Sequence, residues 1–165
     1  MAGIVMNMAQ PRPNMGDIWD PITVTRINTL HPAIRDDTAG FILDLQSQGK
    51  YVRVTQAFRT FEEQQAIFNS DVQAALPGHS WHNFGLAFDV VEVRDGNPTE
   101  ENMLWSNPNW DIITELGRSM GFATSADFQR SPYYGHFEMS FGFTTAELRE
   151  RVREGRVLDG FVILH

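Results

Sequence analysis

A strongly apolar segment from Leu86 to Val93 contains a single carboxylate, Asp89, and this combination constrains the fold more than any other feature of the chain. The segment is predicted to be a strand of the protein core. A carboxylate buried in such a strand is costly unless a cation or hydrogen-bond donors satisfy it. Alternation along the strand also permits Asp89 to face water while Phe88 and Val90 point inward. The sequence leaves both arrangements open.

The rest of the pattern mixes helices and strands without strict alternation. Apolar residues at helical spacing and the capping boxes that begin at Thr60 and Thr144 indicate helices. The predicted helices span residues 32–48, 60–68, 109–121 and 144–154, and the predicted strands span residues 51–57, 86–93 and 134–141. We therefore expect an α+β domain with a small, mostly antiparallel sheet and helices packed against it.

The chain has 165 residues, which is enough for one domain with its own core. Pro11, Pro13 and Gly16 predict an irregular leader over residues 1–25, followed by a single domain over residues 26–165. We expect this domain to be a monomer.

Composition excludes several classes of function. The chain contains no cysteine, which removes disulfides and thiolate nucleophiles. The formal net charge of −8 argues against nucleic acid and anionic lipid as partners. No segment approaches the roughly 20 apolar residues that a membrane-spanning helix requires. The N-terminus has no Lys or Arg before Arg12 and does not resemble a secretory signal.

Two histidines could join Asp89 in a metal site. His82 lies seven residues before Asp89, and Gly85 between them would let the chain turn so that both side chains converge. His136 lies in the predicted strand 134–141. A catalytic zinc ion takes three such nitrogen and oxygen ligands and keeps a further position for water. His31 and His165 are not expected to have a chemical role.

Four segments, in order, resemble the M15 family of zinc peptidases. Residues 80–89 match the signature S-x-H-x-x-G-x-A-x-D, and residues 136–138 match the second signature, H-F-E. Residues 58–64 resemble the family's Y-R-T…E-Q segment, and residues 28–32 resemble the leader of its endopeptidase branch. The resemblance implies the M15 peptidase fold, which is shared with the hedgehog signalling domain, and a zinc peptidase that acts on peptidoglycan stem peptides.

The resemblance also implies roles for individual residues. It assigns zinc ligation to His82, Asp89 and His136, and it places Arg59 where the family has an arginine that holds the substrate carbonyl or carboxylate. A guanidinium suits that task because it stays charged and offers a planar fork of donors. Ser80 and Gln64 match further substrate-binding positions. Without the motif, Arg59 would be read as part of a surface ion pair and Gln64 as helix surface.

One departure concerns the acid that transfers a proton in these peptidases, which in the lysin branch stands three residues before the last histidine ligand. Here that position is Tyr133, whose ordinary pKa near 10 makes it a poor base at neutral pH. Glu138 shares a strand face with His136 and is the preferred candidate for the base. Asp127 is a second candidate if the intervening loop folds back.

The function that we expect is hydrolysis of peptidoglycan stem peptides, with the L-Ala-D-Glu endopeptidase of the lysin branch as the leading form. A D-Ala-D-Ala carboxypeptidase is an alternative, in which Arg59 or Arg130 would meet the substrate's free carboxylate. A catalytically impaired, zinc-containing binding module is another alternative, because the expected acid is missing. Without a recognisable signal, the protein would be made in the cytoplasm and act on the wall after release by another route.

Overall fold

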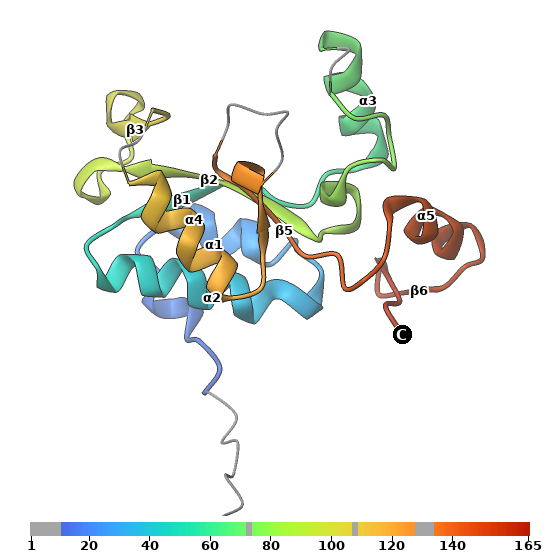
Figure 1. Ribbon diagram of the computed structural model, residues 1–165, viewed down its shortest axis with the longest axis horizontal. Helices are drawn as coiled ribbons and strands as arrows, with labels where there is room; N and C mark the ends of the chain where they lie inside the picture. The colour runs from blue at the N-terminus through green and yellow to red at the C-terminus, as the bar shows by residue number, and fades with distance from the viewer. Residues whose placement is uncertain (1–10, 72–73, 107–108, 128–133) are drawn as a thin grey trace, which may run out of the picture.

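An antiparallel sheet with helices on one face forms the centre of the molecule (Figure 1). The computed structural model describes residues 11–71, 74–106, 109–127 and 134–165. The α-helices are α1 (Pro21–Ile27), α2 (Pro32–Ser47), α3 (Phe61–Ser70), α4 (Trp110–Ser119) and α5 (Thr145–Arg153). The strands are β1 (Val52–Gln56), β2 (Ala87–Val93), β3 (Met103–Leu104), β4 (Ala123–Thr124), β5 (His136–Glu138), β6 (Val157–Leu158) and β7 (Phe161–Val162).

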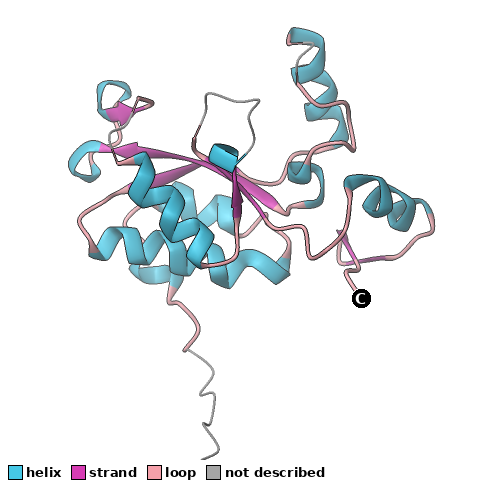
Figure 2. Ribbon diagram, viewed as in Figure 1, coloured by secondary structure: helices cyan, strands magenta, loops and turns pink. Residues whose placement is uncertain are grey.

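The main sheet has the strand order β1-β2-β5-β4 in the described part of the chain, and β3 pairs with β2 beside this path. Each of its pairings is antiparallel, and β6 and β7 form a separate antiparallel pair. Figure 2 shows the mixture of helices and short strands. The predicted α+β class with a small antiparallel sheet is thus confirmed. The two-residue strands β3 and β4 were not predicted, because they are too short to carry a periodic pattern.

The segment before residue 26 is more regular than we expected. A 3₁₀ turn forms at Met15–Asp17, and α1 begins at Pro21. Asp20 caps this helix by accepting from the Thr23 backbone N–H, and it also receives two hydrogen bonds of 2.8 Å from Arg53 of β1. The expectation of an irregular leader is therefore wrong for residues 21–25, because a buried cap and ion pair fix them to the sheet.

Aromatic side chains hold the helices against one face of the sheet. Phe41 of α2 contacts Phe137 of β5 with ring centroids 4.9 Å apart, and Phe88 of β2 stacks on Phe137 at 5.4 Å. Gly117 of α4 lets this helix approach closely, since a Cβ there would lie 2.4 Å from the Phe137 ring. Because side chains alternate along β2 and β5, Asp89, His136 and Glu138 lie on the opposite face of the sheet.

The C-terminal segment, which includes α5 and β7, is bonded to two loops, the one that contains His31 and the one that contains Gly78. His31 contacts the Val162 carbonyl oxygen through Nε2 at 2.9 Å, which gives the otherwise unreactive His31 a structural role. Arg149 of α5 donates to the Gly78 carbonyl at 2.9 Å. Within the described residues, no helix combines the length and hydrophobicity needed to cross a bilayer.

Candidate metal centre

Two neighbouring strands and a short turn bring His82, Asp89 and His136 together. Asp89 of β2 and His136 of β5 are direct partners in the antiparallel register. His82 lies in the 3₁₀ turn η2 (Trp81–Phe84), which Gly85 ends with a φ of +67°. A Cβ at Gly85 would lie 2.7 Å from the His31 backbone nitrogen, so glycine is required both for the turn and for this close approach. One ligand-capable atom of each of the three residues lies within 4.8 Å of the others.

The hydrogen bonds of His82 fix which of its nitrogens faces the cluster. Its Nδ1 lies 2.7 Å from the Ala57 carbonyl oxygen, which can only accept, so Nδ1 carries the proton and donates. Nε2 lies 3.3 Å from Asp89 Oδ1. The imidazole is buried, and a carbonyl that holds its outer nitrogen is the usual support of a metal-ligating histidine.

His136 lies between two carboxylates. Its Nδ1 is 2.8 Å from Asp89 Oδ1, and its Nε2 is 2.8 Å from Glu138 Oε2. Burial opposes the charged imidazolium, but the bonds to Asp89 and Glu138 outweigh it and raise the pKa of His136 to about 9. Burial would likewise raise the pKa of Asp89, yet the two histidines hold it well below its ordinary value. The cluster therefore favours a positive charge at its centre.

This donor set fits a zinc ion. Two imidazoles and one carboxylate supply three nitrogen and oxygen ligands of the kind found in catalytic zinc sites. Asp89 Oδ1 is the atom that both histidines approach, and this shared contact shows the carboxylate directed at the place where a cation would be stabilised. Asp89 points away from the core face that carries Phe88, as alternation along the strand allows. Its carboxylate is nevertheless taken up by contacts with His82 and His136, so both arrangements that the sequence left open hold in part.

Arg59 lies beside this cluster on the loop between β1 and α3. Its backbone N–H donates to the His82 carbonyl at 3.0 Å, and its Nη1 donates to Gln64 Oε1 at 2.9 Å. Burial lowers the pKa of the Arg59 guanidinium, and the nearby Asp89 carboxylate partly offsets this effect. The Nε of Arg59 is buried and has no hydrogen-bond partner among the described residues.

Two other predicted substrate contacts have bonds within the protein. Gln64 is buried rather than on the helix surface, and its amide donates to the Ala75 carbonyl at 2.7 Å while accepting from Arg59. Ser80 caps η2, with its hydroxyl accepting from the His82 backbone N–H at 3.3 Å. Gln64 thus reaches the site through Arg59, and Ser80 supports the turn that carries the ligand.

The candidates for the proton-transferring acid lie in different places. Asp127 is not in the cluster: Arg118 donates to its Oδ1 at 2.8 Å, and the Thr124 backbone N–H donates to its Oδ2 at 3.1 Å. The bond with Arg118 is the main reason that the pKa of Asp127 is lowered. Glu138 lies next to the cluster, where its Oε2 contacts the His136 nitrogen that faces away from Asp89. Tyr133 and Arg130 lie outside the described residues.

Comparisons with known proteins agree with this geometry. A family model described as D-alanyl-D-alanine carboxypeptidase (VanY) matches residues 27–135. The chain is 29% identical over 122 residues to the peptidoglycan L-alanyl-D-glutamate endopeptidase CwlK of Bacillus subtilis (strain 168), a match that covers 67% of this chain and 73% of that protein.

Solved structures show the same fold. The L-Ala D-Glu endopeptidase ChiX of Serratia marcescens superposes with a TM-score of 0.54 at 16% identity, over 73% of this chain and 88% of the other. VanYB in complex with D-alanine-D-alanine gives a TM-score of 0.52 at 19% identity, over 82% and 80%. The fold and the His-Asp-His cluster define a metallopeptidase that hydrolyses the bacterial cell wall. The chain belongs to the VanY, or M15, family of zinc peptidases.

The ligand assignment predicts that His82→Ala no longer binds one zinc ion per chain, because only two of the three protein ligands, Asp89 and His136, remain. Zinc should be measured by elemental analysis after reconstitution and dialysis, with one ion per chain expected for the unaltered protein. His79→Ala is the matched control, since His79 is exposed in the same loop and outside the cluster. Full occupancy in His82→Ala, or an equal loss in His79→Ala, would contradict the assignment.

Proposed function

We propose that this protein is a zinc-dependent endopeptidase that cleaves the L-Ala-D-Glu bond of peptidoglycan stem peptides. The observation that carries the proposal is the cluster of His82, Asp89 and His136 beside the half-buried guanidinium of Arg59. The similarity to the L-alanyl-D-glutamate endopeptidase CwlK favours this bond over others in the stem peptide. A stem peptide is the expected partner, and we propose that the protein acts as a monomer.

His82 would hold the ion through Nε2, Asp89 through Oδ1 and His136 through Nδ1, because these atoms face one another. Bound zinc supplies Lewis-acid polarisation of the scissile carbonyl and activation of water. The protein keeps these side chains in place through their outer contacts. The Ala57 carbonyl holds His82, and Glu138 holds His136.

Arg59 is proposed to bind the carbonyl oxygen of the scissile bond or a nearby substrate carboxylate. Its backbone N–H is bonded to His82 and its Nη1 to Gln64, so both ends of the residue are held beside the ligands. Negative charge develops on the carbonyl oxygen during attack, and a donor already in place stabilises it without reorganisation. Gln64 orients this guanidinium, and Ser80 remains the second proposed substrate contact.

Glu138 is the carboxylate that we propose for proton transfer, since Asp127 is engaged by Arg118. Its bond to His136 gives it a second task, which is to orient that imidazole so that Nδ1 faces Asp89. Proton transfer to the leaving amine would require the Glu138 carboxylate to act through a water or to leave the His136 nitrogen.

Digestion of purified peptidoglycan tests the proposed reaction. An endopeptidase should yield stem fragments with a new D-Glu N-terminus in a mass spectrum, and a chelator should stop their formation. Release of D-Ala alone would indicate the carboxypeptidase activity named by the matching family model. A protein that binds zinc and cleaves no stem peptide would instead be the binding module that the missing acid at Tyr133 suggests.

Arg59→Ala should lower kcat/KM by roughly 100- to 1,000-fold while zinc stays bound, because a donor to the developing oxyanion acts mainly in the transition state. Steady-state kinetics on a soluble stem peptide, with zinc analysis of the same sample, measures both effects. Arg35→Ala is a suitable control, since Arg35 donates to the Leu30 carbonyl away from the cluster. Unchanged kinetics in Arg59→Ala would contradict a substrate contact and favour the alternative that Arg59 only pairs with charges of the protein.

Glu138→Gln and Glu138→Ala distinguish the two proposed roles of Glu138, which are proton transfer and orientation of His136. Gln keeps an oxygen that accepts from His136 Nε2 but cannot take a proton, so Glu138→Gln should lose about 10²- to 10⁴-fold in kcat and retain zinc. Glu138→Ala should also bind zinc about 10- to 100-fold more weakly. Near-normal turnover in Glu138→Gln would limit Glu138 to orienting His136.

A further inference from the structure

The buried amide of Asn83 joins three segments of the chain next to the metal ligand His82. Its Nδ2 donates to the Arg59 carbonyl at 2.9 Å and to the Thr60 carbonyl at 3.3 Å. Its Oδ1 accepts from the Gly78 backbone N–H at 3.0 Å. These bonds fix the orientation of the amide, because the two carbonyls can only accept and the N–H can only donate.

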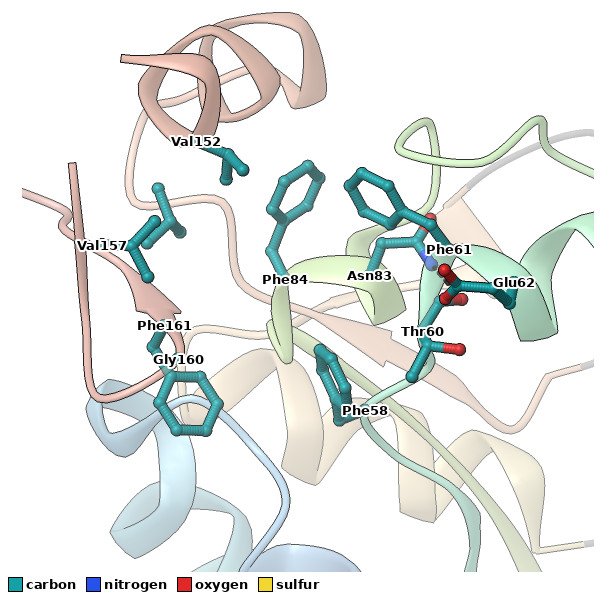
Figure 3. Close-up of a pocket in the computed structure, with 11 residues that line it drawn as sticks. Phe58, Thr60, Phe61, Glu62, Asn83, Phe84, Val152, Val157, Gly160 and Phe161 are labelled. Carbon is teal, nitrogen blue, oxygen red and sulfur yellow. Dashed lines mark hydrogen bonds between the residues drawn. The ribbon is translucent and has the colours of Figure 1, made fainter. Parts of the chain in front are cut away.

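The contacts of Asn83 require an amide side chain. A carboxylate of the same shape could accept from Gly78 but would turn an oxygen towards two carbonyl oxygens. An apolar side chain would remove the partner of the Gly78 N–H and of the Arg59 carbonyl, whereas the Thr60 carbonyl would keep its bond from the Gln64 backbone N–H at 3.0 Å. Figure 3 shows Asn83 beside Phe61 and Phe84 on the wall of a largely apolar groove of about 280 Å³. In such surroundings the Gly78 N–H and the Arg59 carbonyl gain their hydrogen bonds from Asn83.

The same two segments are also joined on the other side of Arg59. The Arg59 backbone N–H donates to the His82 carbonyl at 3.0 Å, and His82 Nδ1 donates to the Ala57 carbonyl at 2.7 Å. Consecutive bonds therefore run from the segment of residues 57–60 to His82 and Asn83. Asn83 adds the bond at the C-terminal end of this short ladder, and its loss would leave the Arg59 backbone joined to residues 82–83 by the single bond from its N–H to the His82 carbonyl.

We propose that Asn83 is a positioning residue, which sets the place of the Arg59 guanidinium relative to the metal ligands by holding the Arg59 backbone against His82. The proposal rests on the proposed function, in which Arg59 binds the substrate oxygen. The Asn83 amide bonds to backbone groups and is not one of the three candidate ligands. A displacement of about 1 Å between groups that act together can cost about 10²-fold in rate.

Asn83→Ala should lower kcat/KM on a stem peptide by about 10²-fold and leave zinc at one ion per chain. Asn83→Asp should lose at least as much, because the carboxylate keeps the Gly78 contact and repels the two carbonyls. Thr38→Ala is the control for loss of a buried hydrogen bond far from the site, since Thr38 donates to the Ile34 carbonyl within α2. This control should cleave at the normal rate.

A double-mutant cycle with Arg59→Ala distinguishes positioning from general support of the loop. If Asn83 acts through Arg59, Asn83→Ala should cause little further loss in the Arg59→Ala background. An equal fold-loss in both backgrounds would overturn the proposal, as would normal activity in Asn83→Ala. Failure of both Asn83 variants to fold, judged by circular dichroism, would assign Asn83 to loop structure and also overturn it.

A second readout keeps this test separate from the proposed reaction. In the cobalt(II)-loaded protein, the visible absorption spectrum reports binding of inorganic phosphate at the metal, and the Arg59 guanidinium should strengthen that binding. Asn83→Ala and Arg59→Ala should each weaken phosphate binding, and the double variant should be no weaker than Arg59→Ala. If the unaltered protein cleaves no peptide, the endopeptidase proposal fails, whereas additive losses in phosphate binding would overturn the role of Asn83.

Discussion

The pairing of β2 with β5 is the interaction on which the rest of the site depends. It places Asp89 directly opposite His136, on the face of the sheet that the helices leave uncovered. The carboxylate is taken out of water, which is costly, and the two histidines that approach Oδ1 offset that cost. The pKa of His136 is raised because Asp89 and Glu138 favour a positive charge between them, and in the absence of a divalent ion the proton on His136 supplies that charge.

The two faces of the sheet have different tasks. The helical face is a packed aromatic core, in which the buried rings of Phe41, Phe88 and Phe137 contact one another. The other face carries polar side chains whose outer atoms are bonded to backbone carbonyls or carboxylates. Close packing of the core fixes the positions of β2 and β5, and through them the backbone positions of Asp89 and His136.

The fold class was predictable from local helix and strand patterns, whereas the ligand cluster was predicted from the resemblance of residues 80–89 and 136–138 to two signatures of the M15 family. Residues 87–93 form the predicted strand, in which every residue except Asp89 is buried, and His82, Asp89 and His136 come together as predicted. The contact between Glu138 and Nε2 of His136 was not predictable. The strand pattern shows that the two side chains lie on the same face of the sheet, but it does not show which of their atoms meet. The positioning role of Asn83 was not predicted, because its partners are backbone groups and the sequence does not show which backbone groups a side chain will meet.

The order in which the chain is synthesised has a consequence for when the site can exist. Asp89 and His136 are separated by 47 residues, and the contact between His31 and Val162 spans 131. Translation proceeds from the N-terminus, so Arg59, His82 and Asp89 leave the ribosome well before His136. A nascent chain therefore carries an incomplete set of ligands until β5 has emerged and paired with β2. Hydrolytic competence therefore cannot precede the synthesis of β5 and its pairing with β2.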